Sequence, residues 1–162
     1  MALGLWLGLA PAAEARKLAF PLLGMEASVP DAYTIDEAGP ARVLLSRKDN
    51  PVGLSFYRVE FGNLDKFSAA HNKELEKFLR QRLGKGAQVE MSSLVVGGRP
   101  ATRVLVSGLR AGKPWQMLAA WSFRGGQAQV VEVLYPAAQR NEAGDLFGQV
   151  CRNLVWVRPE RG

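Results

Sequence analysis

The stretch that decides the fold spans residues 87–135, which read AQVEMSSLVV-GG-RPATRVLVSGL-RAGKP-WQMLAAWSFR-GG-QAQVVEVLY. It holds four runs rich in branched and aromatic residues, and glycine occurs in each gap between them. Glycine pairs between such runs are typical of two-residue β-hairpin turns. Because connections this short can join only antiparallel neighbours, the stretch predicts a four-stranded meander over residues 87–96, 99–109, 115–123 and 127–135.

The third predicted strand has the clearest alternation of positions. Every second residue from Trp115 to Phe123 is apolar, and Trp121 lies among them. The intervening positions include Gln116 and Ser122. Residues two apart in a strand share a face, so the aromatic face of this strand is predicted to be the buried one.

An amphipathic helix is predicted immediately before the meander. The residues that recur at spacings of three and four are Leu64, Phe67, His71, Leu75, Phe78, Leu79 and Leu83. Asn63 or Asp65 can cap the start of this helix, and Gly84 is placed to end it. A helix of this length needs a sheet against which to bury its apolar stripe.

The remaining elements extend the sheet and close the chain. Turn residues predict a turn at residues 49–51 and a loop at residues 30–40. The other expected elements are strands at residues 24–29, 42–47 and 52–61, a helix at 141–153, and a short strand or packed tail at 154–157. The strand expected at residues 52–61, directly before the first helix, carries apolar residues on both faces, which is typical of a central strand. The order predicts an α+β fold, in which a long helix and a C-terminal helix cover an antiparallel β-sheet.

The N-terminus differs in kind from the rest of the chain. Residues 3–13 read LGLWLGLAPAA, and the tripeptide AEA occupies residues 13–15. An apolar run followed by a small-x-small site is typical of a secretory signal peptide, although no basic residue precedes this run. We therefore expect a signal peptide at residues 1–15 and a single exported, periplasmic domain at residues 16–162. The alternative is a short hydrophobic strand or helix buried in the domain.

Composition and charge narrow the classes of function. The chain has 162 residues, 48% hydrophobic and 22% charged, with a formal net charge of +6, as expected for one globular domain that is somewhat basic. The densest basic group is Arg80, Arg82 and Lys85, at the end of the predicted helix, where cations complement the helix dipole. We therefore do not expect a nucleic-acid partner, although a weak affinity for an anionic envelope surface fits the charge. No run of 18 apolar residues follows the N-terminus, so no transmembrane span is expected in the mature chain.

The sequence holds no recognisable catalytic motif. The patterns G-x-S-x-G and H-E-x-x-H and the P-loop are absent. Cys151 is the only cysteine and His71 the only histidine, so the chain offers neither an intrachain disulfide nor a cluster of metal ligands. We expect Cys151 to be a buried structural thiol and His71 to be a core or boundary residue. No catalytic, cofactor or metal site is expected.

The layout resembles the PsbP-like superfamily, which also includes DcrB-like proteins and the Ran-binding Mog protein. The segments that carry the resemblance are VPDAY at residues 29–33, FLRQRL at 78–83, VGGRPATR at 96–103, the dipeptide YP at 135–136 and NLVWV at 153–157. The likeness extends over residues 22–157. It implies an α-β-α sandwich and implies little about activity, because members of the superfamily bind other proteins in quite different systems and share no catalytic motif.

Aromatic residues mark a candidate surface. Trp115, Trp121 and Phe123 share one strand face, and Trp156 near the C-terminus is a second candidate for an exposed aromatic residue. Core filling is the simplest interpretation of the strand aromatics, and the alternative is an apolar groove that helices cover only in part. The leading hypothesis for the function is a noncatalytic protein-binding or chaperone-like accessory module whose partner is another envelope protein. A carrier of a lipid or other small apolar ligand is the alternative, and an enzyme is not expected.

Overall fold

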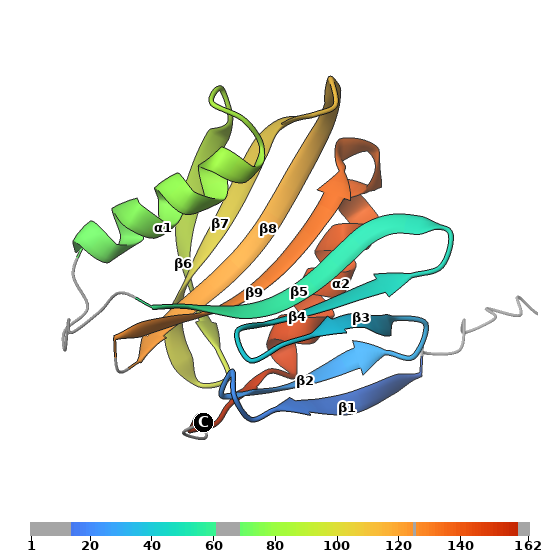
Figure 1. The fold of residues 1–162 in the computed structure, drawn as a ribbon, viewed down its shortest axis with the longest axis vertical. Coiled ribbons are helices and arrows are strands. Elements are labelled where there is room, and N and C mark those ends of the chain that lie inside the picture. Colours follow the sequence, from blue (N-terminus) through green and yellow to red (C-terminus); the bar gives the residue numbers. More distant parts are fainter. Residues whose placement is uncertain (1–13, 61–68, 125, 159–162) are drawn as a thin grey trace, which may run out of the picture.

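The chain folds around an antiparallel sheet of seven strands (Figure 1). The computed structural model describes residues 14–60, 69–124 and 126–158, with the backbone alone for residues 69–71. The strand order is β3-β4-β5-β9-β8-β7-β6, and every neighbouring pair is antiparallel. The bounds are β3 Thr34–Ala38, β4 Arg42–Arg47, β5 Asn50–Glu60, β6 Gln88–Val96, β7 Arg99–Arg110, β8 Lys113–Arg124 and β9 Gln127–Pro136.

A smaller sheet and two helices complete the described fold. The smaller sheet has the order β1-β2-β10, with β1 at Ala15–Phe20, β2 at Met25–Pro30 and β10 at Val155–Trp156. The helices are α1 Ala69–Arg82 and α2 Arg140–Arg152, and a 3-10 turn, η1 Ala137–Gln139, leads into α2. The start predicted for the first helix, at residue 63 or 65, lies outside the described residues. The predicted α+β class, with antiparallel sheets and two helices, is confirmed.

The predicted meander is present. β6 pairs with β7, β7 with β8, and β8 with β9. At the first turn Gly97 and Gly98 have φ angles of 56° and 75°, which residues with a Cβ rarely adopt. A Cβ on Gly97 would also lie 2.6 Å from the carbonyl oxygen of Leu154, so this turn needs glycine for two reasons. β5 pairs with both β4 and β9, so the strand predicted to be central is central.

Helix α1 covers one face of the seven-stranded sheet. Leu75 and Leu79 of α1, and Leu83 directly after it, lie in one buried cluster with Met117 and Trp121 of β8. These are the apolar stripe of the predicted helix and the aromatic face of the third meander strand. Burial is confirmed for these residues, whereas Phe78 of the predicted stripe is 43% exposed and the stripe positions 64, 67 and 71 lie outside the described side chains.

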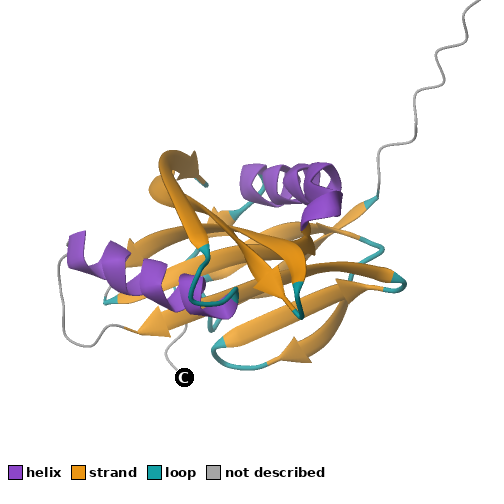
Figure 2. Ribbon diagram, turned by 90° about the horizontal axis from the view of Figure 1, so that it is seen from above, coloured by secondary structure: helices purple, strands orange, loops and turns teal. Residues whose placement is uncertain are grey.

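Helix α2 covers the opposite face together with the small sheet. Phe147 and Val150 of α2 share a core cluster with Leu118 of β8 and Met25 of β2. Figure 2 shows the two helices on opposite sides of the seven-stranded sheet. The layer on this side was predicted to consist of a helix, whereas the structure places a three-stranded sheet beside it.

Two strands lie where none was predicted. β3 occupies part of the predicted loop at residues 30–40, and all five of its residues are exposed, so it lacks the alternation by which a strand is recognised. β1 begins at Ala15, the last residue of the predicted signal peptide, and Ala15 pairs with Pro30. Most of that predicted signal peptide, residues 1–13, lies outside the described residues.

Candidate functional site

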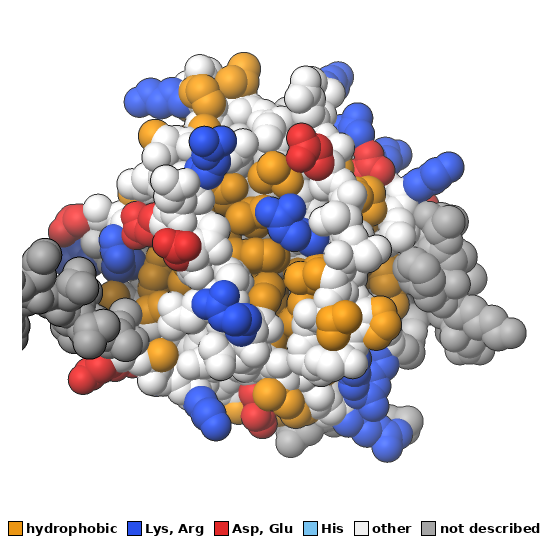
Figure 3. Space-filling view, turned by 180° about the vertical axis from the view of Figure 1, so that it is seen from behind, with side chains coloured by type: hydrophobic (Ala, Val, Ile, Leu, Met, Phe, Trp, Pro, Cys, Tyr) orange, Lys and Arg blue, Asp and Glu red, His pale blue; other side chains and the backbone are white. Residues whose placement is uncertain are grey.

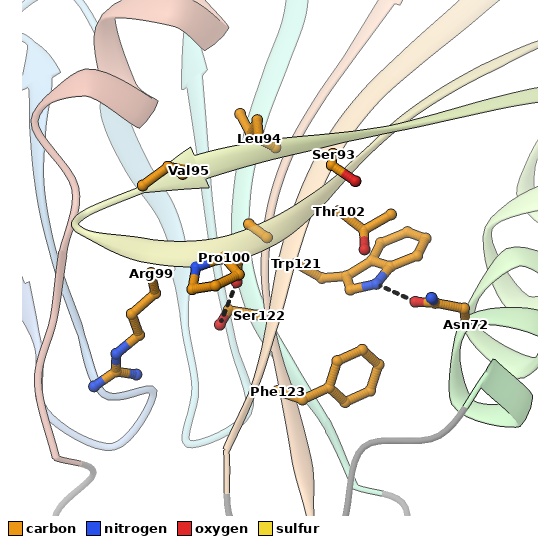
Figure 4. Close-up of a pocket in the computed structure, with 11 residues that line it drawn as sticks. Asn72, Ser93, Leu94, Val95, Arg99, Pro100, Thr102, Trp121, Ser122 and Phe123 are labelled. Atoms are coloured by element: carbon orange, nitrogen blue, oxygen red, sulfur yellow. Dashed lines mark hydrogen bonds between the residues drawn. The ribbon is translucent and has the colours of Figure 1, made fainter.

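A groove opens on the α1 face of the sheet, beside the β6–β7 hairpin (Figure 4). Its volume is about 750 Å³. Its walls come from α1, β6, β7 and β8, which are brought together by the meander and by the packing of α1 across it. Most of its described lining residues are either apolar or carry a hydroxyl group.

Trp121 forms the inner wall of this groove. Its side chain has an exposed fraction of 0%, and its indole N–H donates a hydrogen bond of 3.0 Å to Oδ1 of Asn72 on α1. Figure 4 shows the indole pointing toward this amide. A buried indole needs such a partner for its N–H, so Asn72 both satisfies Trp121 and joins α1 to the sheet.

The outer rim of the groove is apolar and open to solvent. Val95 at the end of β6 is 71% exposed. It pairs with Pro100 across the β6–β7 ladder, and the two-residue period of the strands puts both on the same face as Trp121. Phe123 follows Trp121 by two residues on β8 and is half-buried on the same side.

The groove offers hydrogen-bonding groups and little charge. Arg99 is the one ionisable residue among its described lining residues, and Figure 4 shows its side chain pointing away from Asn72. Burial lowers the pKa of Arg99, and the positive charge of Arg124 lowers it further. The hydroxyl of Ser122 is already used, because it donates to the carbonyl oxygen of Pro100 at 3.3 Å.

Two hydroxyl groups are candidate nucleophiles among the described lining residues of the groove. The hydroxyls of Ser93 and Thr102 line the groove, but a hydroxyl becomes a nucleophile only beside a base. The described lining residues include no carboxylate and no imidazole. The groove can therefore accept an apolar side chain or tail and hold it with a few hydrogen bonds.

Only two of the four predicted surface aromatics meet in this groove, Trp121 and Phe123. Trp115 lies further along β8, opposite Gly108 and Pro136, with the guanidinium of Arg110 4.8 Å from its ring centre. Trp156, expected to be exposed, is buried at 7%.

The burial of Trp156 has a specific cause. Its indole N–H donates a hydrogen bond of 2.6 Å to the carbonyl oxygen of Val96, and its ring packs behind Gly97 in the β6–β7 turn. Trp156 therefore supports the hairpin from the α2 side and does not form an outer surface.

Sequence reasoning missed the residues that complete the groove, above all Asn72 and Val95. Val95 could have been found from the glycine turn at residues 97–98, because a two-residue turn fixes the register and pairs Val95 with Pro100. Asn72 gave no such signal, because a polar residue on a helix surface is ordinarily solvated.

No family model and no curated protein sequence matches the chain. Solved structures do resemble it. Cyanobacterial PsbP (CyanoP) from Synechocystis sp. PCC 6803 is 14% identical with a TM-score of 0.65, over 96% of this chain and 98% of that one. The Ran-binding protein Mog1p of Saccharomyces cerevisiae is 9% identical with a TM-score of 0.63, over 90% and 97% of the two chains.

The chain has the PsbP/Mog1-like fold. LpqN of Mycobacterium tuberculosis, described as involved in cell envelope biogenesis, also shares it, with 14% identity, a TM-score of 0.57 and 83% of each chain covered. The predicted resemblance is thus confirmed at the level of the fold. At these identities a shared fold does not carry a shared activity.

Within this PsbP/Mog1-like fold the single thiol is buried. Cys151 on α2 is 7% exposed, and burial raises its pKa to about 12. The side chain of His71 lies outside the described residues. In the described part of the chain no group of three or more potential metal-binding residues occurs, and no helix there is long and apolar enough to cross a membrane.

The PsbP/Mog1-like sheet also holds a buried carboxylate that does not line the groove. Glu132 of β9 is 1% exposed, accepts a hydrogen bond of 2.6 Å from the hydroxyl of Tyr57 and forms an ion pair with Arg82 at the end of α1. Burial raises the pKa of Glu132, and the charge of Arg82 opposes part of that rise. We infer that the ion pair between Arg82 and Glu132 helps to hold the end of α1 on the sheet.

Proposed function

We propose that this chain is a noncatalytic accessory module of the cell envelope, which binds another protein through the groove on the α1 face. The observation that carries the proposal is the position of Val95, which is 71% exposed at the rim of a groove. The inner wall of this groove is the fully buried Trp121. Apolar surface left open beside a preformed groove is typical of a binding site.

The similar structures support a binding role. One of them, Mog1p, is a Ran-binding protein, and another, LpqN, is involved in cell envelope biogenesis. The absence of acid or base groups among the described lining residues fits a role without catalysis.

An exported location belongs to the same proposal. The signal peptide is proposed at residues 1–15, and cleavage after Ala15 would leave β1 to begin at Arg16. Sequencing the N-terminus of the protein from its native host tests this step. We expect Arg16 as the first residue, and an intact N-terminus in the native protein would contradict export.

Photo-crosslinking tests the binding role directly. We would place a benzophenone amino acid at position 95, on the groove, and at position 35 as the matched control. Ile35 is also exposed, at 45%, but lies on β3 at the opposite edge of the seven-stranded sheet. We expect a discrete protein adduct from position 95 in the host cells and none from position 35. Equal adducts from both positions, or none from either, would contradict binding at the groove.

A carrier of a lipid or other small apolar ligand is the second candidate function. The groove volume of about 750 Å³ favours it, because small-molecule sites fall in a range of roughly 300–1,000 Å³. Native mass spectrometry of the protein purified from its host separates the two candidates. A bound apolar molecule that is lost in a Thr102→Trp variant would support the carrier.

A further inference from the structure

A second surface lies on the opposite face of the sheet, beside α2. The core cluster on this side includes Phe147 and Val150 of α2, and two half-buried leucines, Leu94 of β6 and Leu105 of β7, pack at its margin. Figure 3, which views the molecule from behind, shows a hollow here with an apolar floor and with Lys or Arg side chains beside it. Helix α2 packs mainly on β9, so this margin near β6 and β7 is left open.

Three arginines lie on this side of the sheet, one on β7 and one at each end of α2. Arg103 precedes Leu105 by two residues on β7 and therefore shares its face of the sheet. Its positive charge opposes the rise in pKa that burial causes in both Tyr135 and Cys151. Arg140 acts in the same way on Tyr135, and Arg152 on Cys151. Tyr135 and Cys151 both belong to the core cluster of the α2 side, so the three charges act on groups of one core cluster.

These three arginines lack carboxylate partners among the residues that the structure describes. Five other arginines form ion pairs, namely Arg42, Arg47, Arg58, Arg80 and Arg82. Arg140 and Arg152 are exposed and Arg103 is half-buried, so all three remain accessible to a ligand. We call Leu94, Leu105 and these three arginines the arginine hollow.

The spacing of the charges limits what can occupy the arginine hollow. Arg140 begins α2 and Arg152 ends it, so their Cα atoms are about 18 Å apart at a rise of about 1.5 Å per residue. A single lipid headgroup cannot reach both ends. A peptide segment can, because about six extended residues span that distance.

We propose that the arginine hollow is a second docking site, which binds a segment of a partner protein in which apolar residues are flanked by aspartate or glutamate. The leucines would receive the apolar side chains, and the arginines would bind the carboxylates through the bidentate hydrogen bonds that guanidinium groups favour. The site goes beyond the proposed function of the groove, because it lies on the other face of the sheet and would select its partner by the negative charge of the carboxylates.

A displayed library of random peptides provides the test. We would select it on the folded wild-type protein and measure the affinities of the enriched peptides by fluorescence anisotropy. We expect peptides that combine acidic and apolar residues, bound at least about tenfold more weakly by Arg103→Glu and by Arg152→Glu. Lys48→Glu changes the net charge equally at an exposed position on the β4–β5 turn, and it should alter the affinity less than about twofold.

Two further measurements separate a loss of binding from a loss of folding, and binding in the arginine hollow from binding in the groove. Cooperative thermal unfolding of each variant, with Arg103→Gln as a milder second change, would show that lost affinity is not lost folding. Val95→Asp alters the groove alone, so acidic peptides that still bind this variant locate the interaction in the arginine hollow. Selected peptides without acidic residues, or affinities unchanged by Arg103→Glu, would overturn the proposal. Binding of phosphatidylglycerol vesicles without binding of any acidic peptide would also overturn it, in favour of a membrane surface.

Discussion

Gly108 of β7 lies close to Leu83, the residue that directly follows α1. A Cβ at this position would lie 2.3 Å from the carbonyl oxygen of Leu83 and 2.8 Å from its Cβ. The same carbonyl accepts the backbone N–H of Leu109 at 3.3 Å. Because the obstructing atoms include backbone, they cannot move aside without shifting the end of α1 away from β7.

Replacing Gly108 by alanine should therefore destabilise the protein. We expect Gly108→Ala to lower the free energy of unfolding by about 1–3 kcal/mol, as overpacking commonly does. Urea denaturation measures this change. Gly53→Ala is the matched control on β5, because a Cβ there meets nothing within 4 Å. If both substitutions had the same effect, the close approach of α1 would not be what requires glycine at position 108.

Glu132 should make the stability depend on pH. Its pKa is raised above the ordinary value of 4.5, chiefly by burial, so the folded protein holds this proton at a pH at which the unfolded chain has released it. The folded state then binds more protons, and the free energy of unfolding falls as pH rises from 4.5 through the folded-state pKa. Glu132→Gln removes this titration while keeping an oxygen for the hydroxyl of Tyr57.

The measurement is a series of urea denaturations between mildly acidic and neutral pH. We expect the stability of the wild type to fall more steeply with rising pH than that of Glu132→Gln. Glu90→Gln, at an exposed position on β6, should follow the wild-type profile. A Glu132→Gln profile parallel to that of the wild type would contradict the raised pKa of Glu132.

At the scale of elements, the β6–β7 hairpin is held by a residue near the C-terminus of the chain. The indole N–H of Trp156 on β10 donates to the carbonyl oxygen of Val96, in a buried position. We expect Trp156→Phe to lower the free energy of unfolding by about 1–2 kcal/mol, because it removes a donor from a buried acceptor. Trp115→Phe should have a smaller effect, since Trp115 is only half-buried. Equal losses would indicate that ring volume, and not the hydrogen bond, explains the effect.

The elements differ in how far the sequence could predict them. The meander was predictable because its strands alternate and its turns carry glycine, and α1 was predictable because its leucines recur at helical spacing. β3 was not, because an edge strand with every residue exposed has no face to pattern. Local signals report which residues are buried, and β3 buries none.

The candidate site was predictable only in part for a related reason. Alternation placed Trp121 and Phe123 on one face, where the groove lies. Trp156 near the C-terminus was expected to be exposed, yet its indole N–H donates to the carbonyl oxygen of Val96, sixty positions away. Contacts of this kind, like that between Asn72 and Trp121, are set by the packing of distant segments and leave no local pattern.

At the scale of the whole molecule, the two core clusters share one sheet. β5 illustrates this, because Phe56 belongs to the cluster on the α2 side and the next residue, Tyr57, to the cluster on the α1 side. If the packing on one face of such a strand is lost and the strand moves, the packing on its other face is therefore lost as well. We expect residues 16–162 to unfold as one cooperative unit, in spite of the two separate clusters.

Leu79→Ala tests this expectation by weakening one side only. Leu79 of α1 is fully buried, so its truncation should lower the free energy of unfolding by about 2–5 kcal/mol, whereas Phe78→Ala, at a position 43% exposed, should cost less. Fluorine NMR of protein labelled with fluorotryptophan follows Trp121 on the α1 side and Trp156 on the α2 side separately. Both signals should disappear at the same urea concentration in the wild type and in Leu79→Ala. Loss of the Trp121 signal before that of Trp156 would mean that the α1 layer unfolds alone, and the groove would then open without disturbing the arginine hollow.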